Sequence, residues 1–262
     1  MHVRKRSSFE IFRNVLYALV LREVQGRFGT LRMGAVFTVL EPCLHILGFA
    51  VIFGMIRGGT VGGVDYSVFL LVSLAPFLLF RNIALQMMES LEANRALFAY
   101  RQILPLDTFI ARTLVECALA TIVFVIISVS FEWYGMAAGI NNVLTWLIIL
   151  LAGIMFSFGL GCMFAVVTDF APQIKIFIRL SFLPLYFTSS VFFPPSKLPP
   201  QAINYLLWNP FLHLIEFLRL SALPNYKVAD GVSLAFLMSA SMLSLFIGLA
   251  LYRTRRHELL RL

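Results

Sequence analysis

The sequence predicts an all-α membrane protein that crosses the bilayer several times. Of its 262 residues, 60% are hydrophobic and only 13% are charged, and the mean hydropathy is +0.88. Six apolar segments are long enough to cross a hydrocarbon core, which takes about 20 helical residues. A water-soluble fold is excluded, because its surface would need far more charged side chains.

We expect six transmembrane helices, at residues 33–56, 67–88, 108–131, 143–167, 176–193 and 232–252. With the N-terminus inside, the cytoplasmic segments carry seven Lys and Arg before Met33, two in 89–107, two in 168–179 and four in the tail 253–262, against four outside. Because cytoplasmic loops are enriched in Lys and Arg, both termini are predicted to be cytoplasmic. This bias also explains the net charge of +8 without a nucleic-acid partner.

Residues 1–32 are predicted to form an amphipathic helix in the cytoplasmic interface. Apolar side chains recur there every fourth residue, at Phe12, Leu16, Val20, Val24 and Phe28. The alternative is a basic anchor that only sets topology. Residues 33–262 then form one transmembrane domain, which ends in the cytoplasmic tail 253–262.

Two connections differ from ordinary linkers. The cytoplasmic loop 89–107 is rich in apolar residues, so a short surface helix there would present them to a soluble partner. The outer segment 193–219 is apolar but contains five prolines, and each proline inside a helix costs about 3 kcal/mol or more. Open backbone at membrane depth survives only where protein or a wet cavity covers it. We therefore expect a re-entrant hairpin between the fifth and sixth spans.

Ionisable residues inside the spans are costly and indicate a role. Glu41 is followed by Pro42, which lies in the same span. We expect the carboxylate of Glu41 to bind either a structural partner, such as an arginine of the N-terminal helix, or the substrate. The side chain of Arg81 is expected either to extend to the membrane interface or to line a pathway. Arg112 and Glu116 lie four residues apart, which predicts an ion pair on one helix face.

Stripes of small residues indicate close helix packing in two spans. They are Ala50, Gly54 and Gly58 in the first span, and Gly153, Ser157, Gly161 and Ala165 in the fourth. Their spacing does not decide whether they pack within one subunit or between two.

The chain lacks the residues that catalysis would need. Its four histidines are dispersed without metal-ligand spacing, and its three cysteines lie in apolar segments. The sequence contains no G-x-x-x-x-G-K-[ST] phosphate loop, so this chain is not expected to hydrolyse ATP. We expect no enzyme activity, no metal site and no cofactor bound by this chain.

Three groups of residues resemble the permeases of ABC-2 type polysaccharide exporters, in particular those of capsular polysaccharide export. They are LREVQGRFGTLRMG at 21–34 with Leu40-Glu41-Pro42, then 94–100 with Leu104-Pro105-Leu106-Asp107, and last Phe192-Phe193-Pro194, Trp208-Asn209-Pro210 and 213–219. The resemblance covers almost the whole chain in order.

This resemblance implies a homodimeric permease subunit in the bacterial inner membrane. Two separate ATPase subunits, which bind ATP and Mg²⁺, would drive export of a lipid-linked acidic polysaccharide toward a periplasmic adaptor, a polysaccharide co-polymerase. The alternatives are an O-antigen or teichoic acid permease, or a stand-alone channel or secondary carrier. The last is disfavoured because no inverted repeat stands out.

The resemblance also assigns site residues. Contact with the ATPase is expected at Asn94, Leu97, Phe98, Tyr100 and Arg101. The exit gate is expected at Phe193, Pro194, Trp208, Asn209, His213, Glu216 and Arg219. As a hypothesis from charge, an anionic polymer would be drawn along Arg22, Arg27, Arg32, Arg81 and Arg179.

Overall fold

A computed structural model of the chain describes residues 7–28, 32–57, 60–61 and 64–259. Its elements, in chain order, are α1 (Ser8–Phe28), α2 (Arg32–Arg57), β1 (Thr60–Val61), β2 (Val64–Asp65), α3 (Tyr66–Met88), α4 (Ser90–Asn94), η1 (Arg95–Ala99), α5 (Pro105–Trp133), α6 (Val143–Phe170), α7 (Ile174–Thr188), η2 (Pro195–Lys197), α8 (Pro200–Leu206), α9 (Pro210–Ala222) and α10 (Leu234–Leu259). The described part is mostly helical, as its composition predicts. The two short strands pair antiparallel, with Thr60 opposite Asp65.

Five of the described helices, α2, α3, α5, α6 and α10, are long and apolar enough to cross a membrane. They coincide with five of the six expected spans. The expected span at 176–193 differs, because α7 has 15 residues and ends at Thr188. The helix ends there as the chain turns at Ser190, which takes a left-handed conformation with a φ of 61°. A 15-residue helix rises about 22 Å, less than the roughly 30 Å of a hydrocarbon core.

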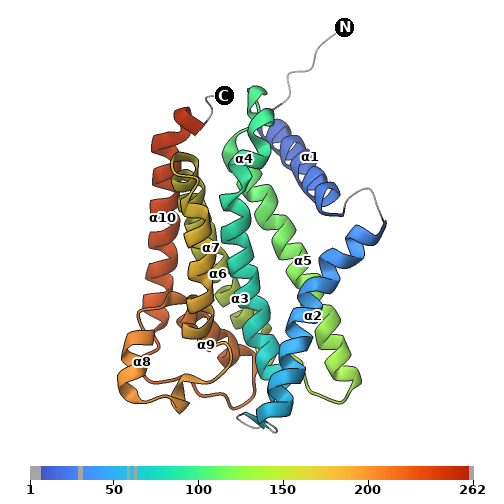
Figure 1. Cartoon of the computed structure of the whole chain (residues 1–262), viewed down its shortest axis with the longest axis vertical. Helices are drawn as coiled ribbons and strands as arrows, with labels where there is room; N and C mark the ends of the chain where they lie inside the picture. Colours follow the sequence, from blue (N-terminus) through green and yellow to red (C-terminus); the bar gives the residue numbers. More distant parts are fainter. Residues whose placement is uncertain (1–6, 29–31, 58–59, 62–63, 260–262) are drawn as a thin grey trace.

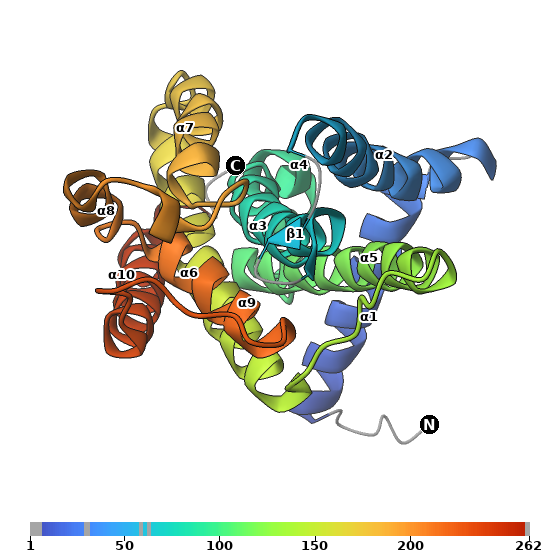
Figure 2. The same ribbon diagram turned by 90° about the horizontal axis from the view of Figure 1, so that it is seen from below.

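Helix α3 occupies the centre of the molecule (Figure 2). Of its apolar window, 78% is buried, compared with 17% for α2 and 22% for α10. Helices α2, α5, α6 and α9 pack around it. The sequence of α3 allows this position because apolar side chains cover every face, among them the buried Phe69, Phe77 and Phe80.

The small-residue stripe of α6 packs against α3 of the same chain. A Cβ atom placed on Gly153 would lie 2.2 Å from the ring of Phe80. One placed on Gly161 would lie 2.8 Å from the side chain of Met87. This stripe is therefore an intramolecular packing surface, which settles for α6 the alternative that spacing left open.

A second close approach joins α6 to α10. A Cβ atom on Gly159 would lie 2.3 Å from the backbone of Ser244, and one on Gly248 would lie 2.4 Å from the carbonyl oxygen of Gly159. The two helices thus touch backbone to backbone, as small residues permit in lipid. In α2, Ala50 is buried, while Gly58 of the predicted stripe lies outside the described residues.

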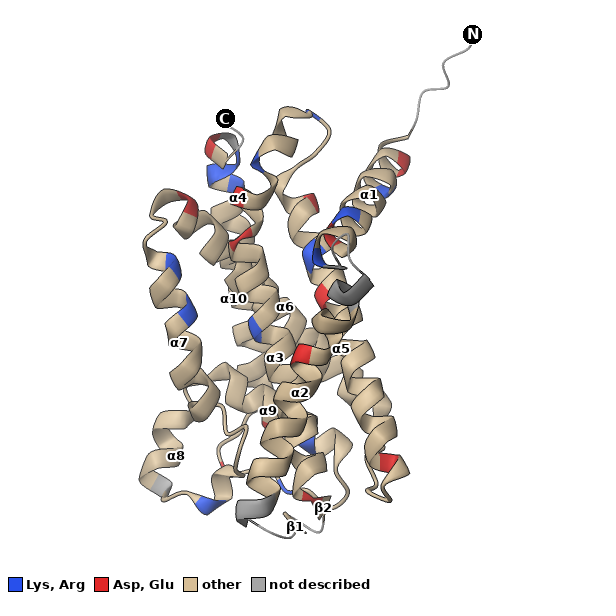
Figure 3. Cartoon of the chain, turned by 45° about the vertical axis from the view of Figure 1, so that its right-hand side comes forward, with Lys and Arg blue, Asp and Glu red and all other residues tan. Residues whose placement is uncertain are grey.

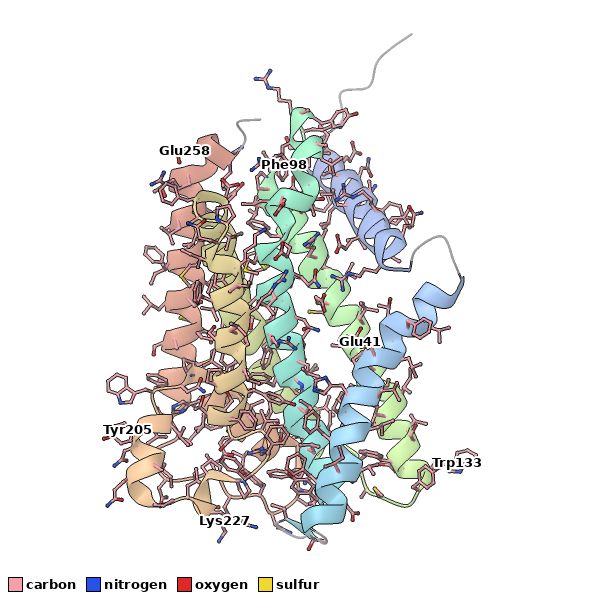
Figure 4. All side chains as sticks on the ribbon, in the orientation of Figure 1. Glu41, Phe98, Trp133, Tyr205, Lys227 and Glu258 are labelled. Atoms are coloured by element: carbon pink, nitrogen blue, oxygen red, sulfur yellow. The ribbon has the colours of Figure 1, made fainter. Side chains whose placement is uncertain are left out.

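The molecule has two different ends. Helix α1, α4 and the last turns of α10 lie at one end, and α8, α9 and the strand pair lie at the other (Figure 1). Phe98 and Glu258 mark the first end, Tyr205 and Lys227 mark the second, and Glu41 lies between them (Figure 4). Charged residues gather at the first end and become sparse along the helices (Figure 3).

Helix α1 forms where the amphipathic helix is expected, and its inward face includes part of the predicted apolar stripe. Leu16, Val20 and Val24 are half-buried, as are Val15, Glu23 and Arg27, and Leu19 is 5% exposed. Phe12, on the predicted apolar stripe, is 39% exposed. The charged side chains turn inward because α5 offers them partners of opposite charge.

Candidate functional site

The loop expected to contact an ATPase folds as two short helices, α4 and η1. Asn94 is buried, and its Nδ2 donates to the carbonyl oxygen of Ser90 at 2.7 Å. The hydroxyl of Ser90 donates to Oγ1 of Thr108 on α5 at 2.9 Å. Phe98 is also buried, at 8% exposed. Asn94 and Phe98 therefore hold the shape of this segment from inside, and they do not face solvent.

The rest of the predicted coupling set faces outward. Tyr100 is 61% exposed and Arg101 is exposed beside it. Leu97 is half-buried and lines a groove of about 300 Å³ between α1 and this segment, together with Leu19 and Arg22. A soluble partner can therefore reach Tyr100, Arg101 and the open side of this groove.

A network of four charges joins α1 to α5. Nη1 of Arg27 lies 2.6 Å from Oε1 of Glu116, and Nε of Arg112 lies 3.3 Å from Oε2 of Glu23. Arg27 also pairs with Glu23 on its own helix at 3.2 Å. The predicted pair between Arg112 and Glu116 is wrong, because each of them pairs with α1 instead. With side chains at most 17% exposed, these pairs fix α1 against α5.

Beside this network lies a groove of about 530 Å³ that is open to the outside. It is lined by Arg22, Glu23, Gly26, Arg27, Thr38, Gln86, Ala93 and Arg112. Three of these eight residues are arginines and one is acidic. Arg27 and Arg112 already pair with Glu116 and Glu23, so Arg22 supplies the excess positive charge that suits an anionic group.

The five arginines of the predicted substrate pathway do not converge on one site. Arg22 and Arg27 line the groove, while Arg179 lies on α7 and pairs with Glu89 at 2.7 Å. Arg81 is half-buried on α3 and has no ion pair within the described part of the chain. Arg32 begins α2, and its side chain lies outside the described residues.

Glu41 lies about midway along α2 with its side chain exposed (Figure 4). Among the described residues it forms no ion pair, so the predicted partner on α1 is not found there. Arg27 of α1 instead binds Glu23 and Glu116. Pro42 lies inside α2, which continues past it.

A fully buried polar cluster lies among the predicted gate residues, around Arg219 on α9. This arginine is completely buried, and its guanidinium lies 4.0 Å from the ring centroid of Phe69. Its Nε donates to Oγ of Ser73 at 2.7 Å, and its Nη2 donates to the carbonyl oxygens of Ser190 at 2.5 Å and Val191 at 2.9 Å. Arg219 thereby ties α9 to α3 and to the chain that follows α7.

Glu216 neutralises this arginine and is equally buried. Its Oε1 accepts from Nη1 of Arg219 at 2.9 Å and from the hydroxyl of Tyr226 at 2.7 Å. Its Oε2 accepts from the backbone N–H of Ala229 at 3.2 Å. A carboxylate with three donors and one opposite charge is well compensated, which explains its tolerance of complete burial.

His213 joins three segments of the same region. Its Nδ1 accepts from the backbone N–H of Ser233, 3.0 Å away, so its Nε2 carries the proton and donates to the carbonyl oxygen of Leu207 at 2.8 Å. Burial lowers the pKa of His213 below its ordinary value, against smaller opposite effects of Leu207 and Glu216. The neutral imidazole therefore links α8 and α9 to the start of α10.

The remaining predicted gate residues divide into two groups. Asn209 caps α9 by accepting from the N–H of Phe211 at 3.0 Å. Trp208 is 80% exposed, whereas Phe193 is half-buried and Pro194 is buried. Trp208 is thus the large predicted gate side chain that faces the surroundings.

Sequence reasoning missed two partners of this cluster, Ser73 and Tyr226. Ser73 is the polar residue in an otherwise apolar stretch of α3, a signal that could have identified it. Tyr226 follows α9 in a loop, and its sequence carries no comparable signal.

Comparison with known proteins identifies the family of this architecture. Residues 14–223 match the family described as ABC-2 type transporter. The chain belongs to the ABC-2 transporter family. Among curated relatives, it is 39% identical to "Polysialic acid transport protein KpsM" of Escherichia coli, over 97% of this chain and 98% of that one.

Two further relatives come from other bacteria. The chain is 30% identical to "Capsule polysaccharide export inner-membrane protein CtrC" of Neisseria meningitidis, over 93% of this chain and 91% of the relative. It is 29% identical to "Capsule polysaccharide export inner-membrane protein BexB" of Haemophilus influenzae, over 95% of this chain and 93% of the relative. The membership of the ABC-2 family that the sequence predicts is thereby confirmed.

Proposed function

We propose that this chain is the transmembrane permease subunit of an ATP-driven exporter that moves a lipid-linked capsular polysaccharide across the bacterial inner membrane. The observation that carries the proposal is the 39% identity to KpsM over nearly all of both chains. The names of KpsM, CtrC and BexB all refer to transport of polysialic acid or export of capsule polysaccharide. We further propose that ATP and Mg²⁺ bind to a separate ATPase subunit, and that this chain contributes neither a cofactor nor a catalytic residue.

The proposed membrane arrangement has six crossings with both termini in the cytoplasm. Helix α7, with Pro184 inside it, is the short fifth crossing, and 193–219 re-enters from the periplasmic side. Exposed apolar side chains on α7, such as Phe177 at 68% and Leu183 at 61%, support its contact with lipid. Helix α8, with its exposed Tyr205, and the exposed Trp208 that follows it would then face the periplasmic adaptor.

The proposed assembly is a homodimer in which each chain forms half of the pathway. The exposed Glu41 and the half-buried Arg81 support this assembly, because a charge at this depth is costly in lipid and favours a wet or protein-covered surface. The cytoplasmic entrance is proposed at the arginine-lined groove between α1 and α5. An acidic, lipid-linked polymer fits its charge.

The ATPase is proposed to bind the segment of α4 and η1 through Tyr100 and Arg101, with the groove beside Leu97 as a second contact. Asn94 and Phe98 support this contact from within, because both are buried. Substituting them would therefore disturb the fold of the segment, whereas Tyr100→Ala would remove an exposed contact alone.

The experiment is export into proteoliposomes that contain the purified chain, with or without its ATPase subunit. A lipid-linked acidic capsular polymer should enter the vesicles only when both the ATPase and ATP are present. Tyr100→Ala should lower ATPase binding and export together, while Trp133→Ala, which changes an exposed residue at the other end, should not. Transport by the chain alone would establish a channel or carrier instead. Preferential transport of an O-antigen or teichoic acid glycolipid would instead identify the chain as an O-antigen or teichoic acid permease.

A further inference from the structure

Helix α7 is only lightly packed against the rest of the protein. Of its 15 residues, Ile178 and Phe182 are buried, and the others are all half-buried or exposed. Figure 2 shows α7 at the periphery, away from the central α3. Its apolar contacts are concentrated in the second half of the helix, where the rings of Phe182 and Tyr186 meet those of Phe211 and Phe77. The first half therefore depends more on its polar contacts.

At its cytoplasmic end α7 is held by ion pairs to the α4 segment. Nζ of Lys175 lies 3.2 Å from Oε2 of Glu89 and also binds Glu92, and Nη2 of Arg179 lies 2.7 Å from Oε1 of Glu89. Glu89 lies between α3 and α4, and Glu92 is in α4. We refer to these four residues as the α4–α7 clasp. The contact with Lys175 lowers the pKa of Glu92, so both groups are charged at neutral pH.

The clasp is partly exposed. The side chains of Glu92 and Arg179 are 75% and 57% exposed, and those of Lys175 and Glu89 are 20% and 29% exposed. Exposed ion pairs are weak, so the contacts of Glu92 and Arg179 can re-form in a new register at low cost. Arg95 of η1 adds a similar pair with Asp169 at the end of α6, at 3.1 Å.

The other end of α7 is attached firmly to the predicted gate. Nδ2 of Asn209 donates to the hydroxyls of Thr188 at 3.2 Å and Ser189 at 3.0 Å. The next two residues, Ser190 and Val191, bind the buried Arg219 through their carbonyl oxygens. Breaking a buried charged contact is far more costly than breaking an exposed one, so this end moves together with α9.

We propose that Lys175 and Arg179 are positioning residues that transmit displacement of the α4 segment through α7 to α9. This inference rests on the proposed function, in which an ATPase acts on 89–107. It gives Arg179 a different role from the sequence hypothesis, which placed that residue in the substrate pathway. The reassignment follows from its 2.7 Å contact with Glu89.

The test measures polymer exported per ATP hydrolysed, in proteoliposomes that contain the permease and its ATPase. One variant carries Lys175→Glu and Arg179→Glu, a second carries Glu89→Lys and Glu92→Lys, and a third combines all four changes. Each reversal should lower export per ATP about tenfold, within the range of ordinary coupling between sites, and the combination should restore most of it. The matched control is Arg255→Glu, which breaks a pair of similar exposure within α10 and should change nothing.

Three outcomes would overturn the inference. One is a combined variant no better than the separate reversals, although all of them insert and bind the ATPase. Another is an unchanged export ratio in the reversals. The third is a higher apparent KM for the polymer with an unchanged ratio at saturation, which would mark Arg179 as a substrate contact. Should the reversals not insert, Lys175→Gln with Arg179→Gln decides the question by the same ratio. If the unmodified complex shows no ATP-driven export, that result would instead contradict the proposed function.

Discussion

Arg219 shows at the residue scale how a charge is kept inside an apolar bundle. Four hydrogen bonds use four of its five donors, and Glu216 supplies the compensating charge. Both side chains are completely buried. Such a pair adds little net stability compared with an apolar pair, but removing one partner leaves the other charge unpaired.

Replacing Arg219 should therefore destabilise the protein strongly. Arg219→Met leaves Glu216 buried without its counter-charge, which should cost about 3–5 kcal/mol of unfolding free energy. Chemical denaturation in detergent micelles measures this loss. Lys227→Met, at an exposed position near α9, is the control and should change stability little. Equal stability of both variants would show that the cluster is not a structural centre.

His213 should make stability depend on pH. Because the folded protein holds its imidazole neutral and its pKa is lowered, the unfolded chain binds a proton more readily. The contribution of His213 is thus fully present above its ordinary pKa of about 6.5, and it is lost as pH falls toward the lowered folded value. Unfolding measured from pH 8 to pH 5 should show this decline. His213→Gln should make the curve flatter, and an unaltered slope would rule out His213 as its source.

At the scale of elements, close approach between helices decides which surfaces are internal. Helix α6 uses one set of small residues against α3 and another against α10. Helix α7, by contrast, is short and peripheral, because the turn at Ser190 and the contacts of Arg219 end it early. The sequence shows an apolar run at both places, at 143–167 and at 176–193, and the packing decides that the second helix ends at Thr188.

Two glycine-to-alanine substitutions should have opposite effects. Gly159→Ala places a Cβ atom 2.3 Å from the backbone of Ser244, and separating α6 from α10 should cost about 1–3 kcal/mol. Gly48→Ala meets no atom within 4 Å and should stabilise α2 by up to about 1 kcal/mol. Thermal unfolding of the two purified variants in detergent compares them. Similar shifts would mean that α6 and α10 separate easily.

At the scale of the whole molecule, the two ends differ in charge and in structure. The end that holds α1, α4 and the last turns of α10 collects most of the charged residues (Figure 3). The other end is built from α8, α9 and the strand pair. This polarity agrees with the Lys and Arg bias of the sequence and supports the proposed orientation.

Single cysteines at the two ends test that orientation. With the native cysteines replaced, Lys227→Cys should react in intact cells with a thiol reagent that passes the outer membrane but not the inner one. Glu258→Cys should react only after the inner membrane is opened. Both positions are exposed, so access to the reagent depends on sidedness. Labelling of Glu258→Cys in intact cells would place the terminal helix in the periplasm.

Much of the candidate site could be predicted as segments, and less of it as side chains. The loop 89–107 and the segment 193–219 can be singled out from the sequence, because apolar residues and prolines mark them along the chain. The direction in which each side chain of these segments points was harder to predict. Asn94 and Phe98 are buried, and so are three of the predicted gate residues, His213, Glu216 and Arg219. Burial depends on which helix lies opposite, and spacing along one segment does not encode that.

The sequence by itself determined the membrane class, five of the spans, the bias of positive charge and the family, because each depends on composition or on order along the chain. Tertiary structure decided which charged side chains pair with each other. Arg112 and Glu116 lie one turn apart, yet they bind Glu23 and Arg27 of α1. Inside a bundle, a charge binds the opposite charge that is nearest in space, and distance in space is set by how helices pack.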